Sequence, residues 1–203
     1  METKTKFNIV ISLAAGIFIG GVIFDALPEA SETLGITRAL VYIIIGYVIW
    51  WLTKILLNQL KKPALPWLTG MALWFHSILE GAATGLAFGV SSTFGFFMLI
   101  AMTLHLLPEF FGAVALMKGA GSTVRNSLFA TFIGFILLYL SFVFTYWLLP
   151  NFDGGLQIAV ALSGGAFLYV GLVSFWKRKS LLNFLSLIAG VVIIFLQSRF
   201  LGL

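Results

Sequence analysis

The chain has 203 residues, of which 61% are hydrophobic and only 9% charged, and its mean hydropathy is +1.09. These values lie far outside the range of soluble globular domains, so an enzyme or binding module that folds in water is excluded. The chain contains no cysteine, which excludes disulfides and thiolate metal ligands. The composition is that of a polytopic membrane protein.

Seven apolar stretches are each long enough to cross roughly 30 Å of hydrocarbon as a helix. They cover residues 7–24, 36–58, 66–90, 94–117, 126–149, 156–176 and 181–201. The connections between them are short and leave no room for a soluble domain. The first stretch is longer than a usual signal-peptide core and lacks a clear A-x-A cleavage site, so we expect a mature helix. We therefore predict an all-α fold, with a single transmembrane domain over residues 1–203.

The charge pattern predicts the orientation of the chain in the membrane. Ten of the twelve basic residues fall on one side of the predicted bundle. They are Lys4, Lys6, Lys54, Lys61, Lys62, Lys118, Arg125, Lys177, Arg178 and Lys179. The positive-inside rule then places the N-terminus in the cytoplasm and the C-terminus outside. This sidedness accounts for the net charge of +5, and no nucleic-acid partner is needed to explain it.

The third and fourth stretches alone carry ionisable side chains near their centres. The two histidines of the chain each stand four residues before a glutamate, in His76-Ser-Ile-Leu-Glu80 and His105-Leu-Leu-Pro-Glu109. Counted at 1.5 Å per residue from opposite membrane faces, His76 and His105 both reach about 15 to 18 Å, near the midplane. A short connection joins the two stretches, so we expect antiparallel neighbours with both pairs at one depth.

These two pairs indicate a metal site. Residues i and i+4 share one helix face, so each helix offers an imidazole nitrogen and a carboxylate. His76, Glu80, His105 and Glu109 could complete a four-ligand shell, and two carboxylates would neutralise a divalent cation. Imidazole with carboxylate suits Zn²⁺, with Fe²⁺ or Mn²⁺ as alternatives. A buried polar network that fixes helix packing would explain the same residues without a metal.

Other polar residues extend this prediction. Asp25 and Glu29, also at i and i+4, could gather cations at an outer entrance, although a solvated helix end would look the same. Ser77 and Thr84 are candidate pathway residues beside the first pair. Pro108 removes a backbone hydrogen bond next to the second pair and should kink that helix.

The motifs resemble those of the ZIP (Zrt/Irt-like) metal transporters. His76-Ser-Ile-Leu-Glu80-Gly81 is similar to the H-N-x-P-E-G motif of their fourth helix, and His105-Leu-Leu-Pro-Glu109 to the H-E-x-P-E motif of their fifth. Residues 14–18 and 27–30 look like the family's second helix, and residues 163–169 like its seventh. The seven predicted helices would then match family helices two to eight, so the resemblance implies a divergent member that lacks the first helix.

The resemblance also implies a function and a site. ZIP proteins carry divalent metals toward the cytoplasm between these two helices. Many members hold two metals, but the residues that match the second site are Ser77 and Leu106 here, so we expect a single metal. The family's second-helix histidine is matched by Asp25, and the proline of its first motif by Leu79.

We therefore expect a divalent-metal transporter in a membrane, most simply a prokaryotic inner membrane, rather than an enzyme. Its expected partners are the metal ion, the lipid bilayer and a second copy of the chain in a homodimer. Two alternatives stay open. One is an intramembrane metal-dependent hydrolase in which the cluster activates water. The other is a metal-sensing or proton-relay membrane subunit that binds ions without net transport.

Overall fold

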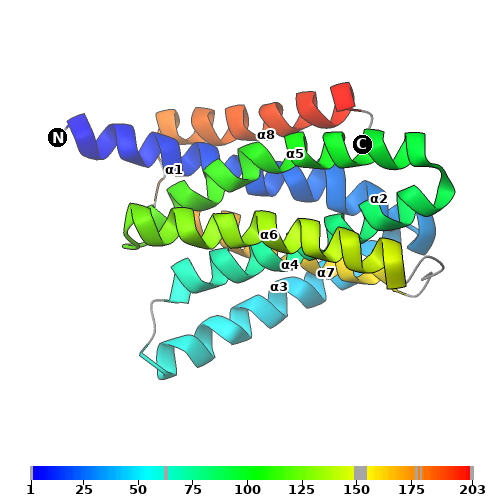
Figure 1. Cartoon of the computed structure of the whole chain (residues 1–203). Helices are drawn as coiled ribbons and strands as arrows, with labels where there is room; N and C mark the ends of the chain where they lie inside the picture. The colour runs from blue at the N-terminus through cyan, green and yellow to red at the C-terminus, as the bar shows by residue number, and fades with distance from the viewer. Residues whose placement is uncertain (1, 62–63, 149–154, 177, 179, 202–203) are drawn as a thin grey trace.

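The structure is a computed structural model that describes residues 2–61, 64–148, 155–176, 178 and 180–201. The fold is all-α, as predicted. Its helices are α1 (Glu2–Gly21), the π-helix η1 (Val22–Ala26), α2 (Leu27–Leu34), α3 (Ile36–Gln59), α4 (Ala64–Val90), α5 (Ser92–Gly119), α6 (Val124–Leu148), α7 (Leu156–Phe175) and α8 (Leu181–Leu201). Because α1, η1 and α2 follow one another without a break, the described chain forms seven rods that run roughly alongside one another (Figure 1).

Six helices in the described part of the chain are long and apolar enough to cross a membrane. They are Thr5–Leu34, Ile36–Gln59, Gly95–Gly119, Val124–Leu148, Leu156–Phe175 and Leu181–Phe200. Helix α4 is not among them, although it has 27 residues. The physical reason lies in its sequence, because His76 and Glu80 lower the hydropathy of its central turns. The chain is an integral membrane protein with six membrane-capable helices, and α4 packs among them.

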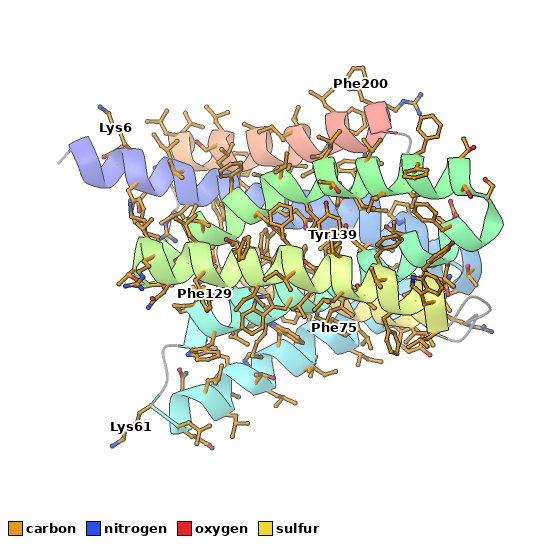
Figure 2. All side chains as sticks on the ribbon, in the orientation of Figure 1. Lys6, Lys61, Phe75, Phe129, Tyr139 and Phe200 are labelled. Atoms are coloured by element: carbon orange, nitrogen blue, oxygen red, sulfur yellow. The ribbon has the colours of Figure 1, made fainter. Side chains whose placement is uncertain are left out.

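The helices divide into an inner and an outer group. Helix α7 is buried along most of its length, and α1, α3 and α4 pack against it. Helices α3, α6 and α8 instead expose many large apolar side chains, among them Phe129, Tyr139 and Phe200 (Figure 2). Such exposure suits contact with lipid tails and would be unfavourable in water. The outer helices therefore pack around a core formed by α7 and by the inward faces of α1, α4 and α5, while α5 also exposes apolar side chains such as Phe111.

Glycine lies at several close helix contacts, two of which involve α4 and α7. A Cβ atom on Gly81 of α4 would overlap the backbone carbonyl of Leu138 in α6. A Cβ atom on Gly165 of α7 would likewise overlap the carbonyl of Ile43 in α3. Small residues at helix contacts allow this approach in membrane bundles, where dispersion contacts drive association. These two seams fix how far α4 and α7 lie from their outer neighbours.

The first rod differs from the sequence prediction, because it continues to Leu34 instead of ending near residue 24. Pro28 has no N–H and would clash with the carbonyl four residues earlier in a regular α-helix. The preceding residues widen into a π-helix, in which the N–H of Leu27 bonds to the carbonyl of Val22. The wider turn lets the helix pass the proline, and it changes the direction in which Asp25 points.

The basic residues that can be located in the structure are grouped at one end of the bundle, as the charge pattern predicts. Lys6 and Lys61 lie at one end of the bundle, while Phe200 lies toward the other (Figure 2). Lys62, Lys177 and Lys179, which also entered the charge argument, lie outside the described residues. The structure contains no membrane, so the assignment of this end to the cytoplasm stays a prediction.

Candidate metal centre

The candidate site lies where α4 and α5 face each other beside α1, η1 and α7. His76 and Glu80 project from one face of α4, and His105 and Glu109 from one face of α5, because each pair is separated by one helical turn. All four side chains are buried, with exposed fractions of 7%, 7%, 2% and 0% in that order. The structure thus brings the four residues of the two sequence motifs into one enclosed cluster.

The donor atoms of these side chains lie close together. The Nε2 atom of His76 is 3.0 Å from Oε1 of Glu80 and 3.4 Å from Oε2 of Glu109. The Nε2 atom of His105 is 3.3 Å from Oε1 of Glu80 and 3.8 Å from Oε1 of Glu109. Donor atoms of His76, His105 and Glu109 all lie within 4.8 Å of one another. Each histidine therefore contacts the glutamate of its own helix and that of the opposite helix.

These separations suit a shared metal ion. Four ligands at the roughly 2.1 Å that Zn²⁺ prefers lie about 3.4 Å from one another in a tetrahedron. The observed nitrogen–oxygen distances, 3.0 to 3.8 Å, fall on both sides of that value. Within the described part of the chain, Nε2 of His76 and both carboxylate oxygens of Glu109 are buried, and they face only other groups of the cluster. Buried polar atoms usually have hydrogen-bond partners, so atoms that face one another in this way fit a shared cation.

Asp25 is a fifth polar group at the cluster. Its Oδ2 atom lies 3.9 Å from Nε2 of His105, so the residue that sequence reasoning assigned to an outer entrance lies beside the site itself. Gly21 provides the room, because a Cβ atom there would stand 2.9 Å from Oε1 of Glu109 and 3.8 Å from Oδ2 of Asp25. The π-helix thus supplies a third carboxylate to a cluster that already has two.

Helix α7 holds the ring of His76. The Nδ1 atom of His76 lies 3.2 Å from the hydroxyl of Ser163, which is fully buried. One turn further along α7, the ring of Phe167 stands 4.6 Å from the imidazole, measured between ring centroids. A partner on Nδ1 leaves Nε2 free to face the carboxylates, as is usual for histidines that bind metals.

The remaining predicted site residues lie around the cluster. Ser77 is buried and faces α6, where a Cβ atom on Gly134 would stand 3.3 Å from its hydroxyl. Thr84 is buried too, and its hydroxyl donates to the carbonyl of Glu80 at 2.8 Å. Glu29 is exposed on α2, one turn beyond Asp25. Thr84 thus contacts the backbone of a cluster residue, and the expected roles of all three residues in a pathway or entrance stay predictions.

Sequence reasoning missed two contributions to this site. Ser163 and Phe167 lie in the segment 163–169 that resembles a family helix, but that apolar helix has no charged residue to indicate their contact with His76. The position of Asp25 depends on the π-helix, whose one sequence signal is Pro28 three residues later. A proline just after an acidic residue in a membrane helix could have suggested an irregular turn there.

Comparison with known proteins points to metal transporters. Zinc transporter foi of Drosophila melanogaster is 26% identical over 148 residues, which cover 68% of this chain and 21% of that protein. Metal cation symporter ZIP14 of Homo sapiens is 26% identical over 116 residues, covering 57% of this chain and 23% of that protein. For ZIP14 of Xenopus tropicalis the identity is 29% over 108 residues, with coverages of 53% and 23%.

These similarities are of low identity, and no family model matches the chain. The chain spans less than a quarter of the length of these curated relatives. Together with the buried group of His76, His105 and Glu109, the similarities support the resemblance to ZIP metal transporters.

Proposed function

We propose that this protein moves a divalent transition-metal ion, Zn²⁺ first among the candidates, through a single site formed by His76, Glu80, His105 and Glu109. The observation that carries the proposal is the buried meeting of two imidazoles and two carboxylates from two helices at 3.0 to 3.8 Å. The relatives named as a zinc transporter and a metal cation symporter favour transport over hydrolysis. The ion is therefore cargo, and the cluster is its resting place within the membrane.

Asp25 is part of the proposed site. With its carboxylate, the cluster would carry three negative charges, and a divalent cation would leave one in excess. Burial of unpaired charge at this depth costs about 3 kcal/mol or more per group, so a bound cation is strongly favoured over an empty ionised site. The buried, apolar Leu106 and the orientation of Ser77 toward α6 support one ion and not two.

We propose that transport runs toward the cytoplasm, with the N-terminus on that side. The basic excess at the end that holds Lys6 and Lys61 supports the orientation, and the resemblance to ZIP proteins implies the direction of transport. Because the chain has no cysteine, single cysteines introduced at Lys61 and Phe200 can report sidedness without further engineering. We expect a membrane-impermeant thiol reagent to label Lys61→Cys only from the cytoplasmic face and Phe200→Cys only from outside. Labelling of both from one face would contradict the orientation.

Metal flux into reconstituted vesicles tests the function directly. Glu80→Ala should reduce Zn²⁺ uptake to the level of protein-free vesicles, because the carboxylate contacts both histidines. Glu32→Ala is the matched control, since Glu32 is an exposed glutamate on α2, and its uptake should equal that of the wild type. Wild-type uptake by correctly inserted Glu80→Ala would refute the proposal. Stoichiometric Zn²⁺ binding without uptake by the wild type would favour a metal sensor instead.

A further inference from the structure

Two prolines lie within the continuous helical segments that carry cluster residues, and each stands three residues after a cluster residue. The two segments are Phe24-Asp25-Ala-Leu-Pro28 and Leu104-His105-Leu-Leu-Pro108. Proline has no N–H, so the carbonyl four residues earlier loses its usual helical partner. The affected carbonyls belong to Phe24 and Leu104, each of which directly precedes a cluster residue. Both missing hydrogen bonds therefore fall at the backbone next to Asp25 or His105.

Adjacent residues of one helix, α8, provide partners for both carbonyls. The hydroxyl of Ser198 donates to the carbonyl of Phe24 at 3.2 Å. The side-chain amide of Gln197 donates to the carbonyl of Leu104, also at 3.2 Å. The turns of α8 before these two residues are apolar, and Arg199 follows them in the last turn of the helix. In a bilayer no water is present to donate a hydrogen bond to such carbonyls, so side chains of neighbouring helices donate it instead.

We propose that Gln197 and Ser198 are positioning residues for the metal cluster. Their hydrogen bonds to the carbonyls of Phe24 and Leu104 hold the backbone directly before Asp25 and His105, where each proline removes a helical hydrogen bond. These two side chains lie only 3.9 Å apart, although they come from different helices, so both anchors act on the same corner of the cluster. The inference rests on the proposed function of the cluster as a metal site.

The physical reason is that a proline-broken helix bends most easily at the missing hydrogen bond. A small rotation of the freed peptide group moves the next side chain, and metal ligands must be held to within about 0.5 Å. Removal of a group that orients a ligand typically weakens metal binding by roughly 10- to 100-fold. Gln197 acts through the backbone, and Ser198 acts through the backbone and also through a side-chain hydrogen bond with Asp25, so we expect roughly 10-fold for each.

The test is a double-mutant cycle on the full chain in detergent or nanodiscs, with Zn²⁺ affinity as the readout. Gln197→Leu should weaken Zn²⁺ binding roughly 10-fold in the wild-type background. Pro108→Ala restores an N–H for the carbonyl of Leu104, so in that background Gln197→Leu should weaken binding less than about twofold. If Gln197 only packed against its neighbours, Gln197→Leu would weaken Zn²⁺ binding equally with and without Pro108→Ala. A smaller loss in the Pro108→Ala background therefore indicates the proposed hydrogen bond.

Ser198 is tested by removal and conservative rescue. Ser198→Ala should weaken Zn²⁺ binding, whereas Ser198→Thr, which keeps a hydroxyl, should restore most of it. The matched control is Ser186→Ala, because Ser186 lies on the same helix and its hydroxyl donates only to a carbonyl of that helix, Leu182, at 2.7 Å. Equal affinity of Ser198→Ala and wild type, or equal loss in Ser186→Ala, would overturn the role of Ser198. Equal loss from Gln197→Leu in both backgrounds, or none in either, would overturn that of Gln197.

A metal-free measurement keeps this inference separate from the proposed function. The carbonyl ¹³C chemical shifts of Phe24 and Leu104 report their hydrogen bonds in protein without Zn²⁺. Ser198→Ala should shift the first signal and Gln197→Leu the second, and unchanged shifts would overturn the anchors. If the wild type binds no Zn²⁺ while both signals shift, the proposed function is refuted. The two hydrogen bonds then exist as structural contacts, but Gln197 and Ser198 are not metal-positioning residues.

Discussion

The two faces of α4 have different roles, one in helix packing and the other in polar contacts. Toward α6 the helix presents Gly81 and Gly85, where added Cβ atoms would meet Leu138 and Thr145. Toward α5 it presents His76 and Glu80, which take part in a network of charged contacts. One face depends on the absence of side chains and the other on their chemistry. Substitutions on the first should therefore change folding, and substitutions on the second should change ion binding.

The largest effect is expected in the polar cluster, at Glu109 of α5, which faces the polar side of α4. Glu109→Gln keeps the size of the side chain but removes the charge of a fully buried carboxylate that faces His76 and His105. We expect Zn²⁺ affinity to fall by more than about 100-fold, beyond the range seen when an outer partner of a ligand is lost. Isothermal titration would measure this fall, and Glu32→Gln serves as the exposed control. Unchanged affinity would remove Glu109 from the site.

On the packing side, Gly81→Leu should act on folding. The new side chain would overlap the backbone of Leu138, and overpacking typically costs about 1 to 3 kcal/mol, or more where backbone must shift. We expect a clear fall in the yield of folded protein and in its thermal unfolding temperature. Gly70→Leu is the matched control, because a Cβ atom on Gly70 meets other atoms only at 4.0 Å. If the two variants unfold at the same temperature, the seam does not limit packing.

Asp25→Asn tests whether the third carboxylate takes part in ion binding by the cluster. Asp25 lies farther from its histidine than the glutamates do, at 3.9 Å from His105. We therefore expect a smaller loss of Zn²⁺ affinity than for Glu109→Gln, on the order of 10-fold. A residue that only gathers ions at an entrance would change the uptake rate at low metal concentration and leave equilibrium affinity intact. Equilibrium titration and initial uptake rates, measured on one preparation, distinguish the two roles.

The smallest effect is expected at Thr84, which sequence analysis named as a pathway residue. Its hydroxyl donates to the carbonyl of Glu80 at 2.8 Å, within its own helix. Thr84→Val keeps the shape and removes only this bond, which is worth about 1 kcal/mol in folding. We expect Zn²⁺ uptake within about twofold of the wild type and a small drop in unfolding temperature. A severe loss of uptake with normal stability would show that the hydroxyl contacts the moving ion.

The sequence was sufficient to predict the helical fold and to select His76, Glu80, His105 and Glu109 as a candidate group. This was possible because helical periodicity alone sets which residues share a face, and buried charges in apolar helices are rare. The hydropathy pattern also predicted seven helices, of which six are apolar enough to span a membrane by themselves. The exception, α4, is the helix whose polar residues lower its hydropathy.

What the sequence could not provide was contact between segments far apart along the chain. The position of Asp25 depends on a π-helix, in which one altered turn redirects every side chain within it. The contact between Ser163 and His76 joins residues 87 positions apart, and no local pattern specifies it. Such pairings follow from helix packing, which depends on the whole bundle.

The burial of the cluster also sets how fast ions can exchange. With the four central side chains at most 7% exposed, an ion can arrive only after the bundle has opened. At high Zn²⁺ concentration the observed association rate should then reach a plateau equal to the opening rate, whereas an open cleft would give a rate that rises in proportion to concentration. Stopped-flow kinetics would thus time the bundle's opening, a property of the helices and not of the metal.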